Sequence, residues 1–324
     1  MRPYVRRALL RLIIAAPVLA CAATAGAEPG YPSRPVKVVV AFPPGQSTDI
    51  ATRYLADKLS QSLGQSFVVE NRAGASGNIG TTSVARAAPD GYTLLMGTSA
   101  THALNPALYK NPGYDAEKDF DPIILTALIP FAISVGADAG IHSLQELVAQ
   151  TRQRPGKVDA ALPSVTGQLV LEMLKQREVP LFGVRFKGSA DAMTAVLGGH
   201  VPVLIDTVAA TRTQLGRIKP LAVTTAAPLA SMPGVKTASE QGLANFNVAA
   251  WNALVVPKGV PAEIQAKLAS EFRKVLDLPE TKKKLAELGF EQAPVMDRPA
   301  LAAWMHAELQ KYVQIVNAAQ MKPE

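Results

Sequence analysis

Four short segments combine small or hydroxyl-bearing residues with glycine, residue types that let backbone amides and hydroxyl groups approach a small anion. Each follows a run of apolar residues that predicts a strand, at residues 36–42, 92–96, 158–162 and 181–186. Ligands of open α/β sheets collect at the carboxyl ends of such strands, so two segments in each half of the chain predict a cleft between two lobes. The candidate ligand-binding residues are Phe42, Pro44, Gly45, Gln46, Ser47, Thr48 and Asp49; Thr98, Ser99, Ala100 and Thr101; Ser164, Val165, Thr166 and Gly167; and Lys187, Gly188 and Ser189.

The first segment carries the most specific expectation. Gly45 lets the backbone come close to a ligand, while Ser47, Thr48 and Asp49 stand where a helix over residues 49–63 is predicted to begin. Free amides and the positive end of a helix dipole favour an anion at this place. A helix cap followed by a tight turn accounts for the same residues without a ligand, and both interpretations stay open.

A candidate acid completes the site. Asp206 follows a strand predicted at residues 201–205, and a buried carboxylate needs a partner because its desolvation is costly. If Lys187 reaches inward and pairs with Asp206, the wall of the second lobe is neutral and suits a plain carboxylate. If Lys187 faces solvent, a ligand ammonium group or a structural donor must serve Asp206, and an amino acid becomes the expected ligand. Lys187 precedes a glycine at a strand end, so we favour the carboxylate.

The sequence matches no catalytic or cofactor template. The two serine-containing glycine segments, at residues 45–49 and 74–78, lack the last glycine of a nucleophile elbow, and no phosphate-binding loop is present. Four scattered histidines and a single cysteine, Cys21, predict no metal site. We therefore expect neither an enzyme nor a cofactor.

The N-terminus predicts export. A basic start is followed by an apolar run at residues 12–20 and by Ala25, Gly26 and Ala27, which form a cleavage signal. We expect a signal peptide over residues 1–27 and a mature periplasmic chain from Glu28, with either general or twin-arginine export. Cleavage before Cys21 and lipid attachment there is the alternative.

The charge argues against a nucleic-acid partner. The formal net charge is +7, and four of these charges come from arginines at positions 2, 6, 7 and 11, within the predicted signal peptide. The remaining excess is too small for the clustered basic face that binding of phosphates requires.

Alternating strands and helices predict an α/β fold of two lobes, each a mainly parallel sheet flanked by helices. Strands are also expected at residues 67–70, 133–135, 221–225 and 251–256, and helices at 84–88, 144–151, 166–176, 190–198, from 261, and at 297–319. A glycine-rich loop is expected at 71–80. The chain should cross between the lobes twice: residues 28–127 form the first lobe, 128–246 the second, and 247–324 return to the first.

The same residues resemble the Bug family, the extracytoplasmic solute receptors of tripartite tricarboxylate transporters. The resemblance rests on Y-P-S-R-P at 31–35, P-P-G at 43–45 with Asp49, V-E-N-R at 69–72, P-D-G-Y-T-L-L at 89–95, K-G-S at 187–189 and P-K-G-V-P at 257–261. It implies a periplasmic-binding-protein fold with a carboxylate held by amides and waters of residues 42–49 and 97–101. Residues 164–167, 187–189 and Asp206 would contact the rest of the ligand. Gln46 and Ser76 stand where the family usually has glycine, and Pro163, Ser164 and Val165 replace a more glycine-rich string.

The resemblance implies a monomeric receptor that captures a small carboxylate and delivers it to membrane transporter subunits, without a cofactor or nucleic acid. A receptor that presents its ligand to a membrane sensor kinase is the alternative. A hydrolase using Ser47 or Ser76 lacks a matched base.

Overall fold

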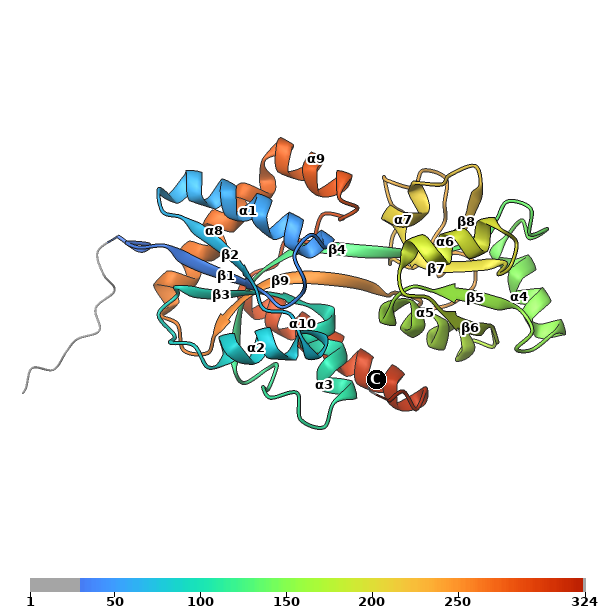
Figure 1. The fold of residues 1–324 in the computed structure, drawn as a ribbon, viewed down its shortest axis with the longest axis horizontal. Coiled ribbons are helices and arrows are strands. Elements are labelled where there is room, and N and C mark those ends of the chain that lie inside the picture. The colour runs from blue at the N-terminus through green and yellow to red at the C-terminus, as the bar shows by residue number, and fades with distance from the viewer. Residues whose placement is uncertain (1–29, 323–324) are drawn as a thin grey trace, which may run out of the picture.

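The computed structural model describes residues 30–322, which form two α/β lobes joined by two long strands (Figure 1). The predicted signal peptide, with Cys21 and the expected mature start at Glu28, lies outside the described residues. Within residues 30–322, no helix combines the length and the apolar character needed to span a membrane.

The first lobe is built on three parallel strands, β1 (Val36–Val40), β2 (Phe67–Asn71) and β3 (Thr93–Thr98), with β1 in the middle. Because β1 is covered on both faces, every residue of the strand except Lys37 is valine. Val38 and Val40 pack with α1 (Ser47–Leu63) and α8 (Ala262–Asp277), whereas Val39 packs with α2 (Asn78–Ala85). The sheet therefore holds the α1 N-terminus at the carboxyl end of β1.

The second lobe repeats this layering. Strands β5 (Asp159–Leu162), β6 (Phe182–Arg185) and β7 (Val203–Thr207) are parallel, with β5 between the other two. Its helices are α4 (Leu144–Gln153), α5 (Val165–Lys175), α6 (Ser189–Leu197) and α7 (Val208–Arg212). The last strand, β8 (Ile218–Val223), pairs with β4. Strand β7 runs to Thr207, so Asp206 lies inside the strand and not after it as predicted.

Two antiparallel strands connect the lobes. Strand β4 (Phe120–Gly136) pairs with β9 (Ala249–Pro257) up to Pro130, and from Phe131 onward it pairs with β7 and β8. The sequence predicted only residues 133–135 of this 17-residue strand. Pro122 and Pro130 break the strand pattern because proline cannot donate to a ladder, yet Pro122 lies at a register shift and Pro130 where the pairing partner changes.

The C-terminal helices complete the first lobe and reach the second. Between α8 and the last helix the chain forms α9 (Pro279–Glu287), which the sequence analysis did not separate. Helix α10 (Arg298–Ala318) contacts β4 and also α5 of the second lobe. Its Trp304 packs edge-to-face on Trp251 of β9, with ring centroids 5.4 Å apart. The two-lobe α/β architecture is confirmed, while the residue bounds of the lobes stay a prediction.

The glycine-rich segment at residues 71–80 is not all loop. A 3-10 turn (Ala75–Gly77) leads into α2 at Asn78, six residues before the predicted start. Gly80 lies within this helix, and a β-carbon there would lie 2.6 Å from the Arg72 carbonyl oxygen, so the close packing requires glycine. The spacing of its glycines therefore reflects close packing as well as a turn.

Candidate ligand-binding cleft

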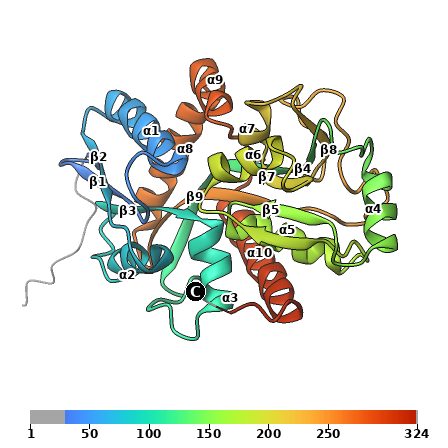
Figure 2. The same cartoon turned by 45° about the vertical axis from the view of Figure 1, so that its right-hand side comes forward.

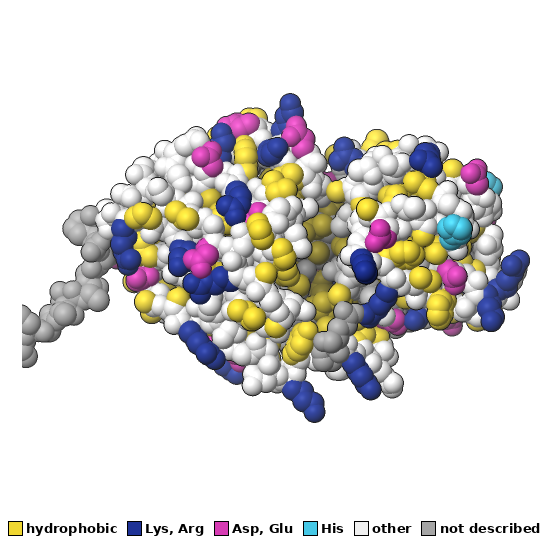
Figure 3. Space-filling view, viewed as in Figure 1, with side chains coloured by type: hydrophobic (Ala, Val, Ile, Leu, Met, Phe, Trp, Pro, Cys, Tyr) yellow, Lys and Arg dark blue, Asp and Glu magenta, His cyan; other side chains and the backbone are white. Residues whose placement is uncertain are grey.

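A groove with hydrophobic side chains along it separates the two lobes (Figure 3). A cavity of about 300 Å³ lies between residues of both lobes. The first lobe contributes Phe42, Ser76, Ala100, Leu104, Asn105, Leu108 and Tyr109, the second contributes Val165, Thr166 and Arg185, and Met321 and Lys322 follow α10. Of the predicted site residues, Phe42, Ala100, Val165 and Thr166 therefore meet at one cavity.

The loop between β1 and α1 is held by Asp49. This carboxylate is buried and accepts hydrogen bonds from the Gly45 amide (2.8 Å), from Asn71 Nδ2 (2.8 Å) and from Arg53 Nε (3.1 Å). Burial acts to raise the pKa of Asp49, but these hydrogen bonds outweigh it and hold the pKa below its ordinary value. The Asp49 carboxylate and the Gly45 amide therefore serve the loop itself, and neither group is available to a ligand in this arrangement.

An anion site remains at the first turn of α1. Gln46, the N-cap residue, makes no side-chain capping bond, and the first intrahelical bond runs from the Ile50 amide to its carbonyl. The amides of Ser47, Thr48 and Asp49 thus begin a 17-residue helix without a capping side chain from Gln46. The N-terminal end of α1 faces the second lobe across the groove (Figure 1). We therefore still expect an anion at this helix end, and the expected donors are the amides of residues 47–49.

Removal of the Asp49 carboxylate should destabilise the first lobe. Asp49→Ala leaves the Gly45 amide and Asn71 without their acceptor, and we expect a loss of about 2–4 kcal/mol in the free energy of unfolding. Urea denaturation measures it, with Asp57→Ala as the control because Asp57 is exposed on the same helix and bonds only Gln61. Equal stability of the two variants would contradict the assigned role of Asp49.

The second predicted segment is mostly turned inward. Thr98 ends β3, and its amide donates to Thr101 Oγ1 (3.0 Å), which lies 2.9 Å from His102 Nδ1. Thr98, Ser99 and Thr101 are buried, so only Ala100 of this segment lines the cavity. Burial lowers the pKa of His102 to about 4, and its ring is neutral at physiological pH. The hydroxyl groups of Thr98 and Thr101 bond within this turn, and their contact with a ligand stays a prediction.

In the second lobe, the residues of the third predicted segment, 164–167, have different roles: some shape the start of α5 and others line a cavity. Ser164 caps α5 by accepting from the Gly167 amide (3.1 Å), and a β-carbon on Gly167 would lie 3.0 Å from the Ile205 carbonyl oxygen. Gly167 is therefore a packing residue. Ser164 and Lys187 line a hollow of about 430 Å³ that shares Val165 and Arg185 with the central cavity.

Asp206 and Lys187 do not pair. Asp206 is 1% exposed, its Oδ1 accepts from the Thr207 amide (2.6 Å), and its Oδ2 has no hydrogen-bond partner among the described residues. Burial raises the pKa of Asp206, although contributions from Ser189 and Thr207 oppose this. No ion pair joins it to Lys187, which is exposed, within residues 30–322. The predicted neutralisation of Asp206 by Lys187 is therefore wrong.

The remaining predicted residues do not line the central cavity. Pro44, Gln46 and Ser47 are exposed at and before the start of α1, and Gly188 and Ser189 stand at the start of α6. The Thr48 hydroxyl lies 3.4 Å from Asn252 Nδ2 on the crossing strand β9. This contact ties the α1 N-terminus to a strand that joins the lobes.

Sequence reasoning missed several cavity residues. Ser76 falls in the glycine-rich loop expected at residues 71–80 and is not among the candidate ligand-binding residues, yet it lines the cavity, and its hydroxyl lies 3.2 Å from the Tyr109 hydroxyl. Asn105 Nδ2 donates to the Ser76 carbonyl (2.9 Å) and holds this turn against the cleft. Arg185 donates to Gln168 Oε1 (3.0 Å) from the end of β6. A cation at the end of a predicted strand was the signal that could have identified Arg185.

Comparisons with known proteins agree with this geometry. The sequence profile described as "Tripartite tricarboxylate transporter family receptor" matches residues 51–321. Protein BugT of Bordetella pertussis is 33% identical over 89% of this chain and 90% of its own. An R. palustris protein solved with adipate is 34% identical with a TM-score of 0.77, covering 91% of this chain and all of that one. MatC from Rhodopseudomonas palustris, solved with malate, is 30% identical with a TM-score of 0.71, covering 88% of this chain and all of that one.

Proposed function

Because the chain belongs to the family of tripartite tricarboxylate transporter receptors, we propose that it captures a small carboxylate between its two lobes and delivers it to membrane transporter subunits. The observation that carries this proposal is the α1 N-terminus, whose amides at residues 47–49 lack a capping side chain from Gln46 and face the second lobe. The adipate and malate held by two similar proteins support the ligand class. The protein acts as a monomeric receptor and not as an enzyme.

The residues that line the cavity narrow the class of carboxylate that could bind there. Phe42, Leu104 and Leu108 offer apolar contacts, while Thr166 and Arg185 provide polar groups on the opposite lobe. A ligand with one carboxylate at α1, a short aliphatic body and a second polar end satisfies both walls. Linear dicarboxylates of four to six carbons fit this description, so they are our proposed substrate class.

A panel of such acids tests the proposal. Addition of a true ligand at a hundred times its dissociation constant should stabilise the folded protein by about 2.7 kcal/mol, which a thermal melt detects. We expect stabilisation by dicarboxylates but not by the corresponding diamides, which lack the charge attracted to the helix end. A panel in which no carboxylate raises the melting temperature would contradict the proposed ligand class.

Export is part of the same proposal. Ala25 and Ala27 satisfy the small-residue requirement for signal cleavage, and receptors of this type work outside the cytoplasmic membrane. N-terminal sequencing of the protein from the periplasm should give Glu28 as the first residue. A lipid-modified start at Cys21 would place the receptor on a membrane surface instead.

A further inference from the structure

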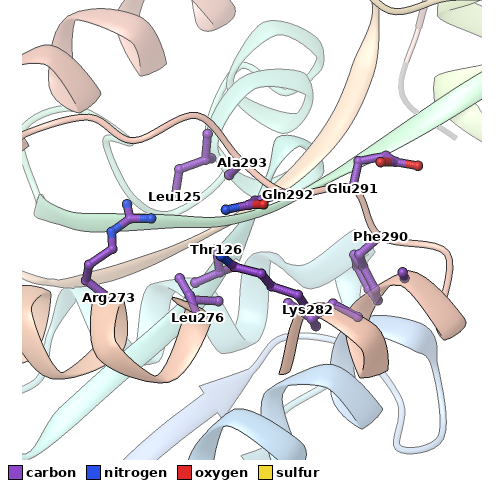
Figure 4. Close-up of a pocket in the computed structure, with 11 residues that line it drawn as sticks. Leu125, Thr126, Arg273, Leu276, Lys282, Phe290, Glu291, Gln292 and Ala293 are labelled. Atoms are coloured by element: carbon purple, nitrogen blue, oxygen red, sulfur yellow. The ribbon is translucent and has the colours of Figure 1, made fainter. Parts of the chain in front are cut away.

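A second hollow, of about 180 Å³, lies between α8, α9 and the crossing strand β4 (Figure 4). Leu125, Leu276, Leu285 and Phe290 form its apolar walls, and each of these side chains is less than 8% exposed. It shares no lining residue with the central cleft cavity. It is therefore a separate site with its own packed walls.

Three polar side chains extend from different segments toward this space. Figure 4 shows Arg273 of α8, Lys282 of α9 and Gln292 of the loop after α9 directed toward one another across the hollow. Arg273 makes no hydrogen bond or ion pair with another residue in the described part of the chain, and it is only half-exposed. Lys282 has Asp277 at 3.5 Å, a long contact between partly exposed groups. Two cations thus line the hollow, and Asp277, which pairs weakly with Lys282, is not one of its lining residues.

The acid that lines the hollow is engaged elsewhere. Glu291 lines the same hollow, but its carboxylate accepts a hydrogen bond from Ser231 of the second lobe. In Figure 4 its side chain points away from Arg273 and Lys282. Its backbone is fixed as well, because Glu291 and Leu128 exchange two hydrogen bonds of 2.8 and 3.0 Å. Glu291 therefore cannot neutralise the two cations without breaking its contact with the second lobe.

We propose that this hollow is a second binding site, for a small organic anion that carries one carboxylate and a short apolar chain. The carboxylate pairs with Arg273, whose guanidinium group suits a bidentate contact, and with Lys282. The apolar chain lies against Leu276, Leu285 and Phe290. The site adjoins the segment that ties the first lobe to Ser231 of the second, and it shares no lining residue with the cleft cavity.

Methyl NMR on leucine- and valine-labelled full-length mature protein, titrated with hexanoate, tests this site. We expect hexanoate to shift the methyl signals of Leu125, Leu276 and Leu285. In Arg273→Met the apparent affinity obtained from these shifts should fall at least tenfold. Methionine keeps the aliphatic stem of arginine and removes the charge. Lys274→Met is the matched control, because Lys274 is the next residue of the helix and pairs on the surface with Glu271 (2.7 Å). The affinity of this variant for hexanoate should lie within twofold of that of the native protein.

Hexanol is the second control, because it offers the same apolar chain without the charge. Equal shifts with hexanol, or equal affinity in Arg273→Met, would overturn the proposed anion site. Shifts confined to Leu104, Leu108 and Val165 would also overturn it, because those residues line the cleft. The cleft proposal would survive each of these results, since its signals are separate.

Discussion

Replacing Gly45 by valine should lower the affinity for the carboxylate ligand by about a hundredfold or more. Gly45 has φ +85°, a conformation that a β-branched residue adopts only under strain. Relief of that strain moves the Gly45 amide away from Asp49, and the adjoining turn that presents the amides at residues 47–49 moves with it. Loss of two charge-assisted hydrogen bonds, each worth about 1.5–3 kcal/mol, accounts for the size of the effect. Isothermal titration calorimetry measures it.

The matched control is Gly140→Val. Gly140 also has positive φ (+66°) and, like Gly45, open space where a β-carbon would stand, but it lies in a turn of the second lobe that lines none of the cavities described above. Both variants should remain folded, whereas only Gly45→Val should lose the ligand. Unchanged affinity in Gly45→Val would place the anion elsewhere in the groove.

Replacing Asp206 by asparagine should make the protein more stable at pH 7.5 while leaving carboxylate binding nearly intact. The buried Oδ2 has no hydrogen-bond partner among the described residues, so the charged form is costly, whereas asparagine keeps an oxygen for the Thr207 amide. We expect a gain of about 1–3 kcal/mol in the free energy of unfolding. Affinity for a dicarboxylate should change less than threefold, because Asp206 is closed off from the groove.

The pH dependence has a definite sign. Burial raises the pKa of Asp206, so the folded protein binds more protons than the unfolded chain between the unfolded and folded pKa values. The native protein therefore loses stability from this group as pH rises through that interval, and Asp206→Asn does not. The stability gap between the two proteins should widen as pH rises above 4 and shrink as pH falls toward 4, as urea denaturation at several pH values would show. An amino-acid ligand that binds tightly and is lost in Asp206→Asn would contradict this assignment.

The sequence predicted the elements well where a single segment determines its own structure. The β-branched run at residues 36–42 and the helix ended by Gly64 were located within a few residues, because period and stop signals are local. The length of β4 was not predictable in this way. Its ladder depends on β9, more than a hundred residues later, and that pairing accommodates Pro122 and Pro130.

Strand ends and helix starts are the part of the candidate site that the sequence can predict, since they follow from the order of elements. Four of the predicted residues, Phe42, Ala100, Val165 and Thr166, line one cavity between the lobes. Which polar groups are free could not be predicted, because it depends on contacts between segments. Asp49 bonds to Asn71, and Thr98 is bonded within its own turn. Arg185 reaches the cavity from a strand that had been expected only to precede Lys187.

The most direct test of the central claim is a crystal structure of the mature protein with the dicarboxylate that stabilises it most. We expect one ligand carboxylate within hydrogen-bond distance of the amides of Ser47, Thr48 or Asp49, with Thr166 or Arg185 approaching the other end from the second lobe. A ligand bound outside the groove, or one held in it without contact to the α1 N-terminus, would contradict the proposed binding site.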